Sequence, residues 1–258
     1  MIYQILILGI IQGVTEFLPV SSDGHLAFLE RLMPGITEFS CEMKLFINVS
    51  LHFATLLAVI LFFRNKLIAI IKERDYLYIL LVLFACIPTG IIGLALKNYV
   101  EEKMNDKMMI SLFFCITGLV LYITRIRQTI LKRRPNYFIA FIAGIFQGIA
   151  VLPGISRSAM TISCLLLFGI NEKEAGDFSF IMSIPAVSGA VLVESRYILS
   201  WNPFEVTPFL GLTIFAGMVV AFISGFFSLK FLYRILEDKI WYKFSYYLFI
   251  IAAINAIV

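Results

Sequence analysis

GIIQGVTEFLPVSSDGH, at residues 9–25, and GIFQGIAVLPGISRSAM, at residues 144–160, are two versions of one pattern. The shared residues are Gly9, Gln12, Gly13 and Ser21 in the first version and Gly144, Gln147, Gly148 and Ser156 in the second. Pro19 and Pro153 align within one residue. In both versions an apolar segment is interrupted by polar residues and by a proline, which cannot continue a helix. The pattern therefore predicts two related helix breaks.

The composition sets the surroundings of these breaks. Of the 258 residues, 60% are hydrophobic and 15% are charged, and the mean hydropathy is +0.94. Soluble domains average about 45–50% apolar and about 25% charged residues, so this chain has too little polar surface to cover a water-soluble globule. The composition predicts an integral membrane protein of the all-α class and excludes soluble enzymes, nucleic-acid binders and disordered scaffolds.

Six uninterrupted apolar stretches each approach the ~17–25 residues that cross a bilayer as a helix. They are residues 46–63, 76–96, 108–124, 178–193, 209–229 and 241–258. We therefore expect a polytopic helical protein with about six full crossings.

The basic residues predict the orientation of these crossings. Lysine and arginine concentrate after the first, third and fifth crossings, and the positive-inside rule makes those loops cytoplasmic. The residues are Arg64, Lys66, Lys72 and Arg74, then Arg125, Arg127, Lys132, Arg133 and Arg134, then Lys230, Arg234 and Lys239. Both termini are then expected outside the plasma membrane. These loops explain the net charge of +4, so the charge is not evidence for an anionic partner.

Residues 1–44 and 136–170, which contain the two breaks, do not fit this alternation as crossings. An odd number of passes through either region would reverse the predicted sides of the loops, so we expect each to be a re-entrant helix-turn-helix. The chain is then one membrane domain, 1–258, with repeat one at 1–124, repeat two at 136–258 and a basic cytoplasmic linker at 125–135. Because about three crossings follow each re-entrant segment, the second repeat is predicted to be inverted relative to the first.

Inverted repeats place their binding site near the membrane midplane, where broken helices from both halves meet. The GxxxG spacing of Gly9 with Gly13, and of Gly144 with Gly148, has a simpler explanation. Small residues let helices pack closely whatever the protein does. We assign these glycines to helix packing and give them no catalytic role.

Four ionisable side chains at the breaks need a reason, since each costs about 2.5–3.5 kcal/mol within a membrane on insertion scales. They are Glu16, Asp23, His25 and Arg157. Gln12 precedes Glu16 by one helical turn and shares its helix face. Ser21 or Ser22 can cap the helix that follows Pro19, and Ser22 and His25 are expected to share the inward face of that helix.

The second break, PGISRS at residues 153–158, combines a Pro-Gly turn, two hydroxyls and Arg157 at a helix start. A guanidinium beside helix N-terminal amides suits bidentate binding of phosphate or carboxylate. Each polar residue also has a structural alternative: the serines could be caps only, and Arg157 could only neutralise Glu16. The concentration of acid, imidazole, hydroxyls and arginine on two related breaks favours a functional site. His52 lies in the apolar run LHFATLLAV without a polar partner nearby in sequence, and we interpret it as a packed, hydrogen-bonded residue.

At these residues the chain resembles the undecaprenyl-diphosphate phosphatase family, the integral-membrane type linked to bacitracin resistance. QGVTEFLPVSSDGH, from Gln12, is similar to the first family signature, and LPGISRSAMTIS, from Leu152, is similar to the second. FSFIMSIPAVSGA and CIPTGIIGL also resemble family segments, so the resemblance covers essentially the whole chain. It implies dephosphorylation of a C55 polyprenyl diphosphate to the monophosphate lipid carrier, at a site open to the outer face. It also implies assistance by a divalent cation, Mg²⁺ or Ca²⁺.

The resemblance implies roles for individual residues. Glu16, Ser22, His25 and Arg157 would be catalytic, and Gln12, Ser21, Gly154, Ser156, Ser158 and Thr161 would line the phosphate pocket. Two positions depart from the family pattern: Asp23 stands where threonine is usual, and Ala159-Met160 stands where Gly-Ala is usual. The Asp23 carboxylate would repel a diphosphate unless it turns away or shares a bound cation, which makes it a candidate modulator or cation ligand.

The predicted reaction is hydrolysis of a lipid diphosphate. Arg157 would hold the terminal phosphoryl group, Ser22 would attack it, and His25 or Glu16 would act as base and then as acid. Direct attack by His25, through a phosphohistidine, stays open as a variant. A transporter or flippase for a polyprenyl phosphate would use the same pocket without hydrolysis, whereas a receptor or structural role would leave Glu16 and Arg157 unexplained. The expected partners are the polyprenyl diphosphate, membrane lipids and a second copy of the chain in a homodimer, and no nucleic acid is expected.

Overall fold

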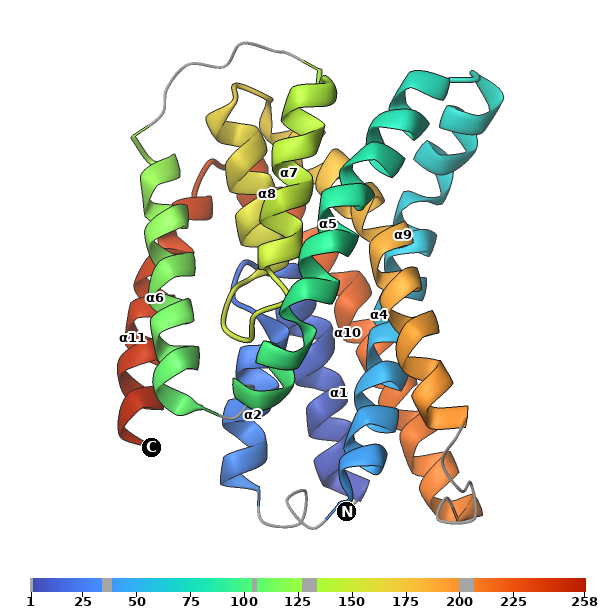
Figure 1. Cartoon of the computed structure of the whole chain (residues 1–258), viewed down its shortest axis with the longest axis vertical. Helices are drawn as coiled ribbons and strands as arrows, with labels where there is room; N and C mark the ends of the chain where they lie inside the picture. Colours follow the sequence, from blue (N-terminus) through green and yellow to red (C-terminus); the bar gives the residue numbers. More distant parts are fainter. Residues whose placement is uncertain (1, 34–38, 104–105, 127–133, 200–206) are drawn as a thin grey trace.

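The computed structural model describes residues 2–33, 39–103, 106–126, 134–199 and 207–258. Every regular element in these residues is helical, as Figure 1 shows. The expectation of an all-α membrane protein is therefore confirmed.

Short helices form two hairpins, and longer helices surround them. The first hairpin consists of α1 (Ile2–Phe17) and α2 (Ser22–Leu32), and the second consists of α7 (Tyr137–Ile149) and α8 (Arg157–Leu167). The other elements are α4 (Cys41–Lys72), α5 (Tyr76–Lys103), α6 (Lys107–Thr124), α9 (Glu172–Leu199), α10 (Pro208–Glu237), the 3₁₀ helix η2 (Trp241–Lys243) and α11 (Phe244–Ile257).

Among the described residues, five helices are long and apolar enough to cross a membrane, judged by length and composition. They are α4, α5, α6, α9 and α10, and they coincide with five of the six predicted crossings. The sixth, at residues 241–258, is divided between η2 and the 14-residue helix α11. At about 1.5 Å per residue, α11 is shorter than the ~30 Å hydrocarbon core, so its length alone does not identify it as a crossing.

The segments rich in lysine and arginine gather at one end of the molecule. In Figure 1 the connections from α4 to α5 and from α10 to η2 lie at the end opposite the two termini. Within the predicted basic linker 125–135, residues 127–133 lie outside the described part of the chain. The cytoplasmic placement of this end stays a prediction from the positive-inside rule.

The two hairpins extend from opposite ends of the molecule, and their turns meet near its middle (Figure 1). α1 ends at Phe17, two residues before Pro19, which has no backbone N–H to continue the helix. α2 begins at Ser22, where the hydroxyl of Ser21 accepts a backbone N–H of the first turn at 3.4 Å. Ser156 caps α8 in the same way at 3.3 Å. The polar residues at the breaks therefore end one helix and start the next.

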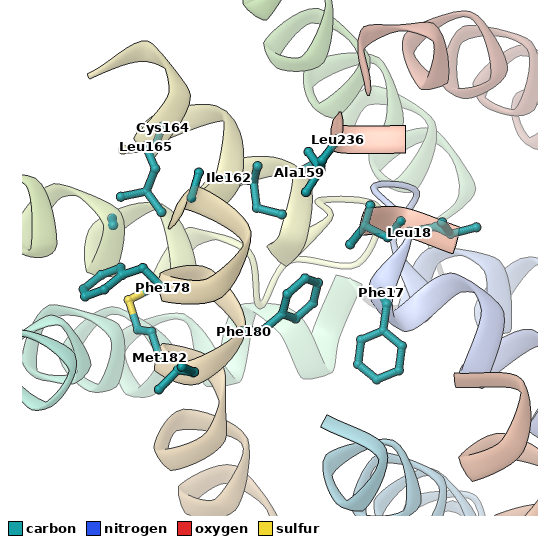
Figure 2. Close-up of a cluster of buried hydrophobic side chains, with 14 of the residues drawn as sticks. Phe17, Leu18, Ala159, Ile162, Cys164, Leu165, Phe178, Phe180, Met182 and Leu236 are labelled. Atoms are coloured by element: carbon teal, nitrogen blue, oxygen red, sulfur yellow. The ribbon is translucent and has the colours of Figure 1, made fainter. Parts of the chain in front are cut away.

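Apolar side chains from both hairpins share one buried core, shown in Figure 2. Phe17 and Leu18 of the first turn lie in this core with Ala159 and Ile162 of α8. The ring of Phe17 meets that of Phe180 edge to face, with 5.8 Å between the centroids. Such aromatic pairs contribute about 0.5–1.5 kcal/mol beyond the burial of their area. The core thereby fixes the two turns relative to each other, together with the polar residues that they carry.

Glycines let α1 pack on α10 and α7 pack on α5 at close range. A Cβ placed at Gly13 of α1 would lie 2.5 Å from the carbonyl oxygen of Ala221. One placed at Gly144 of α7 would lie 2.1 Å from the carbonyl oxygen of Ala85. Backbones this close leave no room for a side chain, which is the usual role of small residues between membrane helices. The assignment of the GxxxG glycines to packing is confirmed.

The substitution Gly144→Ala is expected to destabilise the protein by about 1–3 kcal/mol, because the new methyl group must push α7 away from α5. Gly90→Ala is the matched control. Gly90 lies on α5, the helix against which α7 packs, and a Cβ at this position has nothing within 4 Å. Because alanine is the better helix former, the control should match or slightly exceed the wild type. The midpoint of unfolding in detergent measures both variants, and equal midpoints would contradict the close packing.

Candidate active site

Hydrogen bonds tie the two turns to each other through backbone groups that the breaks leave unpaired. The Gly154 N–H donates to the Ser21 hydroxyl at 3.0 Å, and the Gly154 carbonyl accepts from the Thr117 hydroxyl of α6 at 3.0 Å. The Ser158 hydroxyl donates to the Leu18 carbonyl at 3.2 Å. Gly154 has a φ of 101°, which favours glycine, and a Cβ there would lie 2.6 Å from a backbone oxygen of α6. The non-helical backbone at this depth is thus satisfied by protein groups.

Glu16 is the centre of the polar cluster at this junction. Its Oε1 lies 2.7 Å from Nη2 of Arg157. Its Oε2 accepts from the Ser22 hydroxyl at 2.6 Å and from Nε2 of Gln12 at 3.1 Å. The side chains of Glu16 and Arg157 are only 8% and 14% exposed. The helices α1, α2 and α8 therefore bring together four of the predicted site residues, and Gln12 and Glu16 share one helix face as expected.

A buried ion pair of this kind is better explained by chemistry than by stability. Taking two charges out of water costs several kcal/mol for each ion, and their attraction offsets this cost only when every remaining donor and acceptor is satisfied. The Nη1 atom of Arg157 is buried and has no hydrogen-bond partner within the described part of the chain. An unsatisfied guanidinium N–H beside a helix start can donate a hydrogen bond to an oxygen of an anion. The predicted phosphate contact of Arg157 therefore has a free donor.

His52 of α4 belongs to the same cluster, although the sequence analysis gave it no polar partner. Its Nδ1 lies 3.0 Å from Nε2 of Gln12 and 3.6 Å from Oε2 of Glu16. Its Nε2 lies 3.4 Å from Oδ1 of Asp23. The sequence-based interpretation of His52 as a hydrogen-bonded residue holds, but its partners are the residues of the candidate site.

The signal that could have identified His52 is its position inside a long membrane helix. An ionisable residue there is a functional candidate by default, because it is expensive to bury. Its partners, however, lie on α1 and α2, which are distant in sequence, and neither helical spacing nor the repeat connects them to α4. Only the packing of α4 against the first hairpin shows the contact.

Ser22 and His25 are both buried on α2, as residues of an inward face should be, but their side chains contact different partners. The Nδ1 atom of His25 lies 2.7 Å from the carbonyl oxygen of Ser21, and its Nε2 lies 2.6 Å from the hydroxyl of Tyr247 on α11. Its ring stacks on Tyr247 and meets Phe114 of α6 edge to face. The aromatic residues of α6 and α11 thus hold His25, whereas Ser22 turns to Glu16.

The remaining predicted pocket residues lie close to Arg157 on α8, but their hydroxyls are used within the protein. Ser156 and Ser158 have hydroxyl oxygens 3.2 Å apart, and both side chains are buried. The Thr161 hydroxyl donates to the Arg157 carbonyl at 2.8 Å and lies 2.5 Å from the Ser179 hydroxyl. These residues therefore shape and support the start of α8, which carries the arginine.

The residues of the cluster do not fit a metal centre built by protein ligands alone. No group of three or more His, Cys, Asp or Glu side chains is arranged to hold a metal ion in the described part of the chain. Both oxygens of Glu16 already accept from neighbouring donors, and Asp23 faces His52. Asp23 is the more open carboxylate, with a side chain that is 42% exposed.

Comparison with known proteins identifies the family of the chain. The family model described as "Bacitracin resistance protein BacA" matches residues 5–254. Proteins named undecaprenyl-diphosphatase from Carboxydothermus hydrogenoformans, Halothermothrix orenii and Methanococcus vannielii are 35%, 36% and 34% identical to this chain. The alignments cover 96%, 97% and 95% of this chain and 94%, 95% and 95% of the relatives. The resemblance expected from the two signatures is thus confirmed, and the chain belongs to the BacA family of bacitracin resistance proteins.

Proposed function

We propose that this chain is a multi-pass membrane enzyme that hydrolyses undecaprenyl diphosphate to undecaprenyl phosphate and inorganic phosphate. The observation that carries the proposal is the contact of Glu16 with both the Ser22 hydroxyl and the Arg157 guanidinium, at the junction of two broken helices. The shared name of the relatives supports the same reaction and favours it over the transporter alternative.

Arg157 binds the terminal phosphoryl group in this mechanism. Its Nη1 provides a buried N–H, and the first turn of α8 adds the positive end of a helix dipole. Charge that develops on the phosphoryl oxygens in the transition state is then stabilised by groups already in place. Contact with phosphate would draw the guanidinium away from Glu16 and leave that carboxylate free to accept a proton.

Ser22 is the nucleophile that the geometry favours. Its hydroxyl already donates to Oε2 of Glu16 at 2.6 Å, which is the contact that a serine and its general base require. The Ser22 oxygen bonds to the terminal phosphorus, the bond from phosphorus to the bridging oxygen breaks, and Glu16 returns the proton to the departing lipid phosphate. Water then attacks the phosphoserine with Glu16 as base. The bond from phosphorus to the Ser22 oxygen breaks, Glu16 returns the proton to that oxygen, and inorganic phosphate is released.

His25 attack would require a different arrangement of α2. Both ring nitrogens of His25 have partners in the structure, the Ser21 carbonyl and the Tyr247 hydroxyl. We therefore propose that His25 stabilises α2 against α11 and reaches the substrate only if Tyr247 releases it. Detection of a phosphohistidine at His25 would contradict Ser22 as the nucleophile.

Several finer predictions accompany this function. We propose one membrane domain with repeats at 1–124 and 136–258, the second inverted. In support, the first helix of each repeat packs on a long helix of the other repeat: α1 packs on α10, and α7 packs on α5. The termini outside the plasma membrane, the outward opening of the site, the homodimer and the divalent cation stay predictions. No step of the mechanism depends on the cation.

Arg157→Ala and Glu16→Gln should each lower phosphate release by about 100-fold to 1,000-fold or more, because the first removes the charge that stabilises the transition state and the second removes the general base. Arg157→Lys should recover only part of the activity, since lysine keeps the charge without the planar fork. Purified protein in detergent with a prenyl diphosphate and a phosphate assay provides the measurement. Arg196→Ala, on the surface of α9, is the matched control and should keep wild-type turnover. Retained turnover in both site variants would contradict the assignment.

Trapping the covalent intermediate distinguishes Ser22 from His25. Brief reaction with substrate labelled at the terminal phosphate, followed by rapid denaturation, should leave label on the protein that survives acid and is lost in alkali, as for phosphoserine. Ser22→Ala should carry no label, whereas His25→Ala should still be labelled. Label that is lost in acid and is absent from His25→Ala would identify His25 as the nucleophile instead, and acid-stable label that persists in Ser22→Ala would place the phosphate on another hydroxyl.

A further inference from the structure

The polar contacts of the site continue beyond the residues used in the mechanism. From Ser22 they pass through Glu16 to Gln12, then to His52, and end at Asp23. The exposed fraction of the ionisable side chains rises along this path, from 8% for Glu16 to 20% for His52 and 42% for Asp23. The path therefore joins the buried centre of the site to its more open edge.

The direction of each hydrogen bond follows from Glu16. Its carboxylate accepts from Arg157 and Ser22, so Gln12 must present its NH₂ group and not its carbonyl to Oε2. The opposite amide orientation would place two acceptor oxygens 3.1 Å apart. An NH₂ group has two hydrogens, and the second points to Nδ1 of His52 at 3.0 Å.

The tautomer of the neutral His52 ring follows from this orientation of the Gln12 amide. Because Nδ1 accepts from Gln12, the ring proton of the neutral imidazole is on Nε2, which faces Oδ1 of Asp23. Asp23 thus has a hydrogen-bond donor inside the protein. The sequence had suggested two other arrangements, in which the carboxylate turns away from the substrate or shares a bound cation. The contact with Asp23 also orients the imidazole whose other nitrogen holds Gln12.

We propose that His52 is a positioning residue of the active site, and that Asp23 holds it in place. His52 accepts the second N–H of Gln12 through Nδ1, which keeps the first N–H on Glu16. Glu16 then stays aligned with Ser22 when Arg157 moves to the phosphate. This inference rests on the proposed phosphatase function, and its residues lie on three helices, α1, α2 and α4.

Three substitutions of His52 separate the two contacts. His52→Leu removes both. His52→Asn keeps an acceptor close to the Nδ1 position but does not reach Asp23, whereas His52→Gln places an amide near the Nε2 position and leaves Gln12 without its acceptor. Thr55→Val is the matched control, because among the described residues the Thr55 hydroxyl bonds only to backbone carbonyls of its own helix.

We expect kcat for phosphate release to fall about 10-fold to 100-fold in His52→Leu, as misplacement of a catalytic group does, with KM changed less. His52→Asn should recover most of this loss and His52→Gln little, while Thr55→Val keeps the wild-type kcat. In a Gln12→Ala background, His52→Leu should lower kcat little further, because the side chain through which His52 acts on Glu16 is already absent. Unfolding midpoints recorded in detergent identify any variant that is merely misfolded. If His52→Leu is misfolded, the comparison of His52→Asn with His52→Gln still tests the proposal.

Three results would overturn the proposal. The first is a wild-type kcat in His52→Leu. The second is a double variant, Gln12→Ala with His52→Leu, whose fold-loss of kcat equals the product of the two single fold-losses. The third is an equal rise in the Mg²⁺ concentration for half activity in His52→Asn and Asp23→Asn, which would make the pair a cation site. Failure of the wild-type protein itself to release phosphate would instead contradict the proposed function, so the two failures are distinguishable.

Discussion

Backbone groups released where a membrane helix breaks must find hydrogen-bond partners inside the protein, and the centre of this molecule is arranged around that requirement. The two turns satisfy each other: the N–H of Gly154 bonds to the Ser21 side chain, and the carbonyl of Leu18 bonds to the Ser158 side chain. Thr117 of α6 completes the set with the Gly154 carbonyl. Each turn therefore supplies hydrogen-bond partners for the backbone of the other.

The same junction makes a polar site possible in an apolar chain. Once the turns are joined, Glu16 and Arg157 from distant parts of the sequence lie within contact distance and share the cost of burial. The aromatic core beneath them, with Phe17 and Phe180, keeps this geometry fixed. A preorganised site of this kind stabilises charge that develops during a reaction better than flexible groups in water can.

The interactions in the site divide into those that follow the helix period and those that do not. Gln12 and Glu16 are one turn apart on α1, so their contact was predictable from spacing. Ser22 and His25 also have helical spacing, yet they face different partners, because Tyr247 and Phe114 attract the imidazole ring. Spacing fixes which side chains can share a face, and the neighbouring helices decide which of them do.

Sequence alone was enough to predict the membrane setting, the two breaks, and the charged residues that a bilayer does not tolerate without a reason. These conclusions depend on composition and on local patterns, which are complete in the chain. The place of His52 in the site, and its contact with Asp23, became visible only in the folded arrangement of the helices. Those contacts cross between α1, α2 and α4, and no local pattern encodes the packing of helices that are distant in sequence.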